Sequence, residues 1–233
     1  VKGEVHEIVA GMMGGGLDGL VADGDPIIDQ VFGQAHDLRA TGGDDRWAGT
    51  KFDDVARGFG GKDVLNGKGG DDKLFGGNQR DKLIGGAGDD TLIGGGGPDL
   101  LKGAKGSDIL KGGAGSDKLV GGPGSDILVG GQGSDTFVFA KAGHARGDKI
   151  RDFSSTQGDV IDLSGIDANG NRLDDQDFSL IGDAGFSGSA GELRVTTNGS
   201  KTFVTGDTDG DDSQDFRIVL IGSYDLGADD FLL

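Results

Sequence analysis

The chain has 233 residues, of which 51 are glycine and none is cysteine, so disulfide bonds are excluded. With 40 acidic and 22 basic residues its formal net charge is −18, which argues against nucleic acid and anionic membrane surfaces as partners. No stretch approaches the length of a membrane-spanning helix, so membrane insertion is not expected.

Residues 1–39 form a leading segment of uncertain structure, compatible with short helices or with the end of an upstream domain. His6-Glu7 resembles the start of an HExxH zinc motif, but Ala10 occupies the place of the second histidine. We therefore expect no catalytic residue and no enzyme activity in this chain. The chain begins with Val1 and lacks a signal-peptide core there. We expect a C-terminal fragment, with any catalytic domain upstream.

Residues 40–138 consist of a nine-residue unit repeated eleven times. Position 6 of the unit is aspartate in every copy, from Asp45 to Asp135, and position 8 is always apolar, from Trp47 to Phe137. Glycine occupies position 1 in ten copies and position 4 in nine. This period indicates a repeat architecture, because a disordered glycine-rich linker would not keep aspartate and leucine in phase.

Each constant position has a physical role. Glycine permits positive φ, so a six-residue loop at positions 1–6 can turn its carbonyls inward. Ca²⁺ prefers six to eight oxygen ligands from carboxylates and carbonyls, and the aspartate supplies the charge. Positions 7–9 are too short for a helix and are predicted to be a short strand with one buried side chain. Two units then make one coil of loop, strand, loop and strand.

These units, such as GGAGSDKLV at 112–120, resemble the RTX family, whose repeat is GGxGxDxUx with U apolar. The resemblance implies an all-β fold, a right-handed parallel β-roll with two repeats per turn. It also implies that calcium lies between loops stacked on the same side, so that each aspartate pairs with the one eighteen residues later. About seven to nine calcium ions are implied for this chain.

The resemblance assigns the calcium-binding residues to the aspartates and glycines of the regular units. The implied aspartates are Asp63, Asp72, Asp81, Asp90, Asp99, Asp108, Asp117, Asp126 and Asp135. The implied glycines are Gly85, Gly86, Gly88, Gly94, Gly95, Gly97, Gly103, Gly106, Gly112, Gly113, Gly115, Gly121, Gly122, Gly124, Gly130, Gly131 and Gly133. Pairs that include Asp45 or Asp54 lie in the less regular units. Arg80 departs from the pattern and is expected to weaken a neighbouring site.

An ion-free roll is expected to be unfavourable. Two carboxylates about 4 Å apart repel by about 1 kcal/mol in water and about 4 kcal/mol at an effective dielectric of 20. The repeats also hold 29 of the glycines, each of which costs extra entropy to order. Metal binding must therefore supply much of the folding free energy, so the roll should be unfolded at low calcium.

Residues 139–233 lose the period and are predicted to form an antiparallel β region that caps the roll. Apolar runs predict strands, and Asn198-Gly199 predicts a tight hairpin between two of them. The predicted strands are 160–163, 178–181, 192–197, 202–205 and 216–221.

The segments 147–170, 178–195 and 206–220 resemble the C-terminal domain of serralysin-type metalloproteases. That resemblance implies that Asp148, Asp152 and Asp159 help to hold calcium at the end of the roll. The final residues, Asp229-Asp230-Phe231-Leu232-Leu233, resemble a type I secretion signal, although they are equally compatible with a final strand. The implied transient partner is a type I ABC transporter, and the implied location is extracellular or at the cell surface.

Asp207, Asp209, Asp211 and Asp215 have the alternating spacing of an EF-hand-like loop. Asp212 stands where such a loop needs glycine, and Ile218 where it needs glutamate. The loop is thus either a calcium site or an acidic solvated turn.

Together these patterns predict a non-catalytic, calcium-binding module that folds outside the cell. Two alternatives stay open. One is an adhesin or polysaccharide-binding module, which would need exposed aromatic residues on one face; the repeats offer only Trp47, Phe52, Phe59 and Phe75. The other is the non-catalytic C-terminal part of a secreted enzyme such as a metalloprotease.

Overall fold

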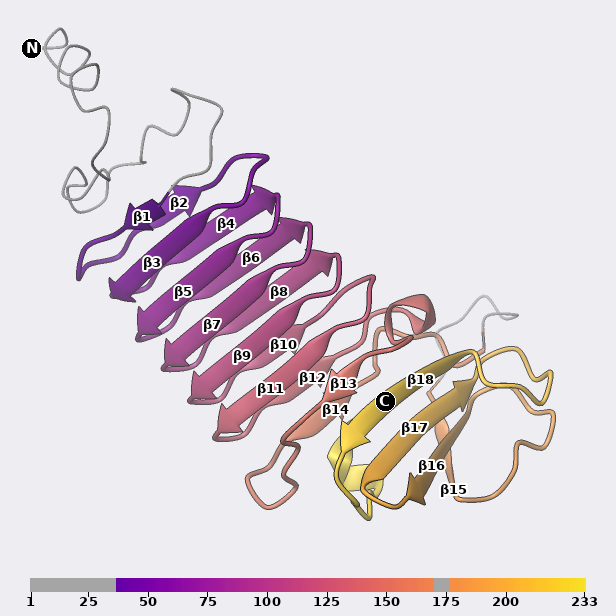
Figure 1. The fold of residues 1–233 in the computed structure, drawn as a ribbon. Helices are drawn as coiled ribbons and strands as arrows, with labels where there is room; N and C mark the ends of the chain where they lie inside the picture. The colour runs from indigo at the N-terminus through magenta and orange to yellow at the C-terminus, as the bar shows by residue number, and fades with distance from the viewer. Residues whose placement is uncertain (1–36, 170–176) are drawn as a thin grey trace, which may run out of the picture.

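The computed structural model describes residues 37–169 and 177–233, which form two long β-sheets (Figure 1). Of the predicted leading segment 1–39, residues 1–36, including His6, lie outside the described residues, and residues 37–39 form a strand of the roll, β1, paired with β3. No helix in the described part is long and apolar enough to cross a membrane. The two sheets face each other as the walls of a solenoid, which confirms the predicted all-β parallel roll.

Successive strands of the roll alternate between the two sheets. The eleven-stranded sheet has the order β1-β3-β5-β7-β9-β11-β13-β18-β17-β16-β15, and the eight-stranded sheet has the order β19-β14-β12-β10-β8-β6-β4-β2. The strands of the roll, taken over both sheets, are β1 (Asp37–Arg39), β2 (Arg46–Ala48), β3 (Val55–Gly60), β4 (Val64–Gly69), β5 (Lys73–Asn78), β6 (Lys82–Ala87), β7 (Thr91–Gly96), β8 (Leu100–Lys105), β9 (Ile109–Ala114), β10 (Lys118–Val120), β11 (Ile127–Gln132) and β12 (Thr136–Val138).

Neighbouring strands of each sheet are parallel and eighteen residues apart. Leu74 of β5 lies beside Leu92 of β7, and Leu65 of β4 lies beside Leu83 of β6. Two units therefore complete one turn, as the resemblance implied. The leucines at position 8, with Trp47, Ala56 and Phe137 at the ends, point inward from both sheets and form a narrow buried core.

The strands are longer than the sequence pattern predicted. Eight of them have six residues and span positions 7–9 of one unit and 1–3 of the next, instead of positions 7–9 alone. Pairing skips position 1, for example Gly67, and resumes at positions 2 and 3. The backbone thus bends at position 1 without leaving the sheet, and only positions 4–6 form the turn.

The roll continues past residue 138. β13 (Lys149–Ile150) pairs in parallel with β11, and β14 (Val160–Asp162) pairs in parallel with β12. The segment of β14 was expected in the antiparallel region. It joins the roll because Asp159, Val160 and Ile161 repeat the aspartate and apolar pattern after an insertion.

The C-terminal strands extend the first sheet and close the second. They are β15 (Ser179–Gly182), β16 (Glu192–Asn198), β17 (Lys201–Asp207), β18 (Phe216–Ile221) and β19 (Phe231–Leu232). β16, β17 and β18 are antiparallel, and the Asn198–Lys201 pair closes the predicted hairpin. β18 lies parallel to β13, and β19 lies parallel to β14, so both sheets of the roll receive a covering strand (Figure 1).

Candidate calcium sites

The position-6 aspartates form two ladders, one along each row of turns. The first ladder consists of Asp45, Asp63, Asp81, Asp99, Asp117 and Asp135, and the second of Asp54, Asp72, Asp90, Asp108 and Asp126. In both ladders the Oδ1 atom accepts a hydrogen bond from the backbone N–H of the aspartate one turn earlier, at 2.7–2.9 Å. The structure therefore brings together the aspartate pairs that the resemblance implied.

The second carboxylate oxygen of most ladder residues is buried and has no hydrogen-bond partner. These Oδ2 atoms belong to Asp63, Asp72, Asp81, Asp90, Asp99, Asp108, Asp117, Asp126, Asp135 and Asp148. Each of these side chains is at most 3 % exposed. A buried carboxylate oxygen without a partner is costly, so each of these atoms requires a cation or a proton.

Glycine at position 1 provides the space in which these oxygens lie. A Cβ atom on Gly58 would stand 2.0 Å from Asp63 Oδ2 and 2.4 Å from the carbonyl oxygen of Gly76. The same cradle of carboxylate and carbonyl oxygens recurs at Gly76, beside Asp81 Oδ2, and at Gly112, beside Asp117 Oδ2. An all-oxygen donor set of this kind fits Ca²⁺.

The electrostatics of the ladders agree with this geometry. Burial raises the pKa of Asp72, Asp90, Asp99 and Asp126 to about 7, and neighbouring carboxylates add to the effect. Burial likewise raises the pKa of Asp63, Asp81, Asp108 and Asp135 to about 6. The single backbone hydrogen bond at each carboxylate only partly offsets the loss of hydration.

At the N-terminal end of the roll, threonine residues donate hydrogen bonds to the second oxygen of two ladder aspartates, so these oxygens do not require a cation. Asp45 Oδ2 accepts hydrogen bonds from the N–H and the hydroxyl of Thr41, at 2.8 and 3.1 Å. Asp54 Oδ2 receives the same two bonds from Thr50, at 2.6 and 3.0 Å. These two aspartates keep their place in the ladders but differ from the ten with an unpartnered oxygen.

At the C-terminal end, three further aspartates complete the ladders. Asp148 Oδ1 accepts from Asp126 N–H, and Asp159 Oδ1 accepts from Asp135 N–H, although the spacing is 22 and 24 residues. Asp152 accepts from the N–H groups of Gly130 and Gly131, both at 2.9 Å. Burial raises the pKa of Asp148 to about 8. Its signal in the sequence is the run Asp148-Lys149-Ile150, which matches positions 6–8.

The two rows of turns differ at position 5. In the second row, Asp71 N–H donates to Asp53 and Asp89 N–H donates to Asp71, so a further exposed carboxylate stacks beside the second ladder. The first row has Asp44 at one end, followed by Lys62 and Arg80. Arg80 acts to lower the pKa of Asp99, as expected for a cation near the ladder.

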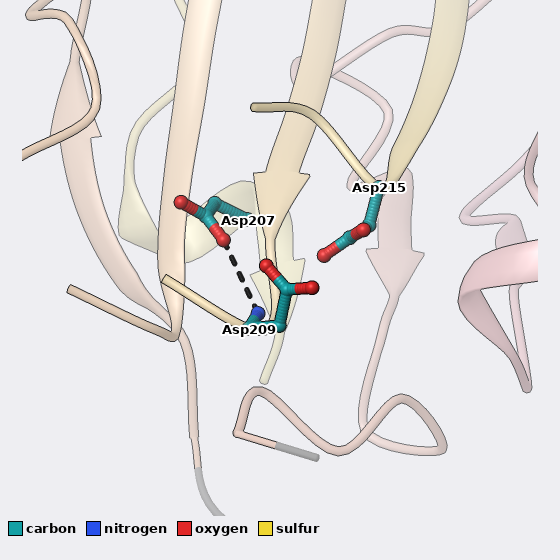
Figure 2. Close-up of side chains that lie close together, drawn as sticks. All are labelled: Asp207, Asp209 and Asp215. Atoms are coloured by element: carbon teal, nitrogen blue, oxygen red, sulfur yellow. Dashed lines mark hydrogen bonds between the residues drawn. The ribbon is translucent and has the colours of Figure 1, made fainter. Parts of the chain in front are cut away.

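The acidic loop after β17 has a different arrangement (Figure 2). Carboxylate oxygens of Asp207, Asp209 and Asp215 lie within 4.8 Å of one another. The Asp207 carboxylate is fully buried and accepts from the N–H groups of Asp209, Gly210 and Asp212. Asp215 accepts from the N–H and hydroxyl of Thr208. Asp211, also predicted for this loop, instead accepts from Ser213.

The predicted glycines all lie around the ladders, at positions 1, 2 and 4 of the units. Position-1 glycines face the unpartnered oxygens, as Gly85 faces Asp90. Of the aromatic residues weighed for an adhesin surface, Trp47 is buried in the core, whereas Phe52 and Phe59 are exposed.

Comparison with known proteins places the repeats in a family. The model of the RTX calcium-binding nonapeptide repeat matches residues 39–74, 66–101 and 102–137. No curated protein matches the chain significantly. The resemblance of residues 139–233 to serralysin-type domains stays a prediction.

Three solved structures are similar to parts of the chain. The AlgE6R2 subunit of the Azotobacter vinelandii mannuronan C5-epimerase is 32% identical, with 64% of this chain and 90% of that chain covered and a TM-score of 0.47. The AlgE6R3 subunit of the same enzyme is 31% identical, with coverages of 66% and 78% and a TM-score of 0.30. The extracellular lipase LipA from Serratia marcescens is 16% identical, with coverages of 86% and 42% and a TM-score of 0.34. With its repeats matched from residue 39 to residue 137, the chain belongs to the family of RTX calcium-binding nonapeptide repeat proteins.

Proposed function

We propose that the chain is a structural module that folds on binding calcium through its two aspartate ladders. The observation that carries the proposal is the set of ten buried Oδ2 atoms without a hydrogen-bond partner. Five lie in each row of turns, and neighbours one turn apart make four pairs in each row and eight in all. One ion at each pair would fall within the expected range of about seven to nine.

The residues proposed to hold calcium are the ladder aspartates from Asp63 to Asp135 with Asp148, and carbonyls of the glycines around them. Asp152 and Asp159 are proposed to support the last ions, since they complete the turns beside Gly130 and Asp135. The aspartates supply charge that balances the ion, and the glycines supply neutral oxygens. When bound, calcium supplies the positive charge that lets stacked carboxylates remain ionised while buried.

A calcium titration followed by far-UV circular dichroism tests this function. Chelator should leave the repeats largely without β structure, and millimolar calcium should restore it. Magnesium should not substitute, because its small octahedral shell fits a carbonyl-rich cradle poorly. Full β content in excess chelator at pH 7.5 would contradict the proposal.

The export route is part of the same proposal. A chain unfolded in low calcium suits a type I channel, and folding in external calcium would oppose its return. Of the C-terminal residues predicted as the signal, Asp229 and Asp230 end a short 3-10 helix, and Phe231 and Leu232 form β19, where Phe231 is buried beside Ile161 of β14. Signal and strand are compatible, because the transporter would meet the chain before it folds.

Deleting 230–233 and measuring the medium-to-cell ratio in a host with a type I transporter tests this route. The ratio should fall to background, while the purified truncated chain should still gain β structure in calcium. Ile161→Ala is the matched control, since it disturbs the contact between β14 and β19 but leaves the predicted signal residues unchanged, so its ratio should stay close to that of the intact chain. Equal ratios for the intact and deleted chains would place the export signal elsewhere.

A further inference from the structure

The outward face of the eleven-stranded sheet has a charge opposite to that of the chain. In the described strands β3, β5, β7, β9, β11 and β13, positions 8 and 1 of the unit are buried. The positions that alternate with them, 7, 9 and 2, point outward. None of these outward positions holds an acidic residue, although the chain has 40 of them. Basic residues stand there instead, namely Arg57, Lys73, Lys111 and Lys149.

The same face continues across the C-terminal strands. Lys149 of β13 lies beside Val219 of β18, which pairs with Phe203 of β17. By alternation, the outward residues there include three more basic side chains, Arg194, Lys201 and Arg217. Glu192 and Asp207 end this face, but both are buried, and their carboxylates accept hydrogen bonds from the chain. From β3 to β16 the face extends about 40 Å at the usual strand spacing.

Two shallow hollows lie on this face, and each combines an aromatic ring with arginine. The first, of about 430 Å³, is lined by Arg57, Phe59, Phe75 and Asn78, with a floor of glycine. The second, of about 360 Å³, is lined by Arg194, Phe203 and Arg217 together with one acidic residue, Asp212. The Arg57 guanidinium lies 5.1 Å from the centre of the Phe75 ring, and that of Arg217 lies 4.0 Å from the Phe203 ring.

Phe59 combines a positive φ with an exposed aromatic ring; Lys68 and Ala104 have a positive φ at the same position of the eight-stranded sheet, but neither carries an apolar ring. Phe59 stands at position 2 with a φ of 69°, where the following strands of this sheet have Gly77, Gly95, Gly113 and Gly131. A bulky residue in this region of φ is strained, and such strain is found at ligand-binding sites. Its ring is 50 % exposed, so burial does not offset the strain.

We propose that this face binds a linear anionic polysaccharide, one that carries carboxylate or sulfate groups along an extended chain. Arginine forks recognise such groups bidentately, and Phe59 offers an apolar surface to a sugar ring. The strip between positions 7 and 9 is about 7 Å wide, which suits a single extended chain. Asp53, Asp71 and Asp89 line the adjoining turns and repel a broader polyanion.

The arrangement of the aromatic rings also favours a saccharide over single-stranded nucleic acid. Bases bind by stacking on open aromatic faces. Here Arg57 lies over the Phe75 ring and Arg217 lies over the Phe203 ring. A ligand would therefore meet the guanidinium group on that face of each ring. The proposal rests on the calcium-bound roll, because this face exists only when the strands are paired and because calcium cancels the charge of the ladders in the turns beside it.

The probe is a short oligogalacturonate, with its methyl ester as the uncharged control of the same backbone. After circular dichroism has shown that the full chain is folded in calcium, binding is measured by calorimetry at two salt concentrations. The acid form should bind, more weakly at high salt, and the ester should not. A folded chain that does not bind the acid form would overturn this proposal and leave the calcium function intact. Equal affinity for single-stranded DNA would overturn the assignment to a saccharide.

Two sets of variants locate the site. Arg57→Gln with Lys111→Gln should weaken binding about tenfold, which corresponds to about 1.4 kcal/mol. The matched pair Lys82→Gln with Lys102→Gln, outward on the eight-stranded sheet, should change it little. Equal losses in the two pairs would reduce the effect to non-specific charge and reject the site. Phe59→Gly should weaken binding about three- to tenfold without raising the calcium midpoint. Unchanged binding in Phe59→Gly would remove the first hollow from the site.

Discussion

The aspartate ladders and the loop from Asp207 to Asp215 are both rich in carboxylates, yet they are stabilised in different ways. In the ladders each of the ten carboxylates from Asp63 to Asp135 and at Asp148 accepts a backbone hydrogen bond at Oδ1, and its second oxygen is buried without a partner. In the loop the buried Asp207 accepts three backbone N–H groups. The loop therefore completes its own hydrogen bonding, whereas the ladder requires an ion. Carboxylate density alone does not distinguish a metal site from a hydrogen-bonded turn.

The largest expected effect comes from neutralising an interior ladder residue. Asp117 lies between Asp99 and Asp135, so Asp117→Asn removes charge from two proposed sites. The calcium midpoint of folding should rise by roughly tenfold, about 1.4 kcal/mol, as measured by circular dichroism. Asp45→Asn is the control, because Thr41 already satisfies the second oxygen of Asp45. Equal shifts in the two variants would show that the unpartnered oxygens do not mark the sites.

Acidity should affect the ladders in opposite directions with and without calcium. Their pKa values are raised to about 6–7 by burial, so the ion-free folded roll binds more protons than the unfolded chain. In chelator, stability should be greatest near pH 4 and be lost as the pH rises through about 6–7. In calcium, protons compete with the ion, so the calcium midpoint should rise as the pH falls from 7.5 to 5.5. Titrations at three pH values, followed by circular dichroism, would check both trends.

A smaller effect is expected from the cation beside the first ladder. Arg80 follows Gln79 at the turn next to Asp81 and Asp99, where the second row has Asp71 and Asp89. Arg80→Ser gives this turn the residue found at position 5 of later units such as Ser116, and should lower the calcium midpoint about twofold. The mirrored change, Asp71→Ser, should raise it. A lower midpoint in both variants would mean that turn conformation, not charge, controls these sites.

The smallest effect is expected in the acidic loop. Asp209 is solvent-facing there, and its neighbour Asp207 receives the backbone hydrogen bonds that hold the turn. Asp209→Asn should leave the calcium midpoint of the roll unchanged and should not alter the number of ions bound in equilibrium dialysis. Loss of one bound ion in this variant would make the loop a calcium site and would remove the contrast with the ladders.

The period of the units predicted the roll, the two repeats per turn and the aspartate pairs, because a strict spacing leaves few alternatives for the chain. It did not place β13 and β14 in the roll, although a strand was predicted at 160–163, since insertions before Asp148 and Asp159 hide two further copies of the pattern. It also missed the role of Thr41 and Thr50, which depends on side-chain geometry within a turn. Net charge was misleading for the outward face, because folding segregates the aspartates into the turns and the basic residues onto the strands.

The constant offset of eighteen residues within each sheet also sets how the roll can change in length. Removing two consecutive units, such as residues 76–93, would keep every remaining strand in its own sheet and every aspartate in its own ladder. Removing a single unit would transfer all later strands to the opposite sheet. Their outward side chains would then lie on the outer face of that other sheet. The module can therefore grow or shrink only by whole turns, and each turn moves its C-terminal cap by one strand spacing, about 4.8 Å.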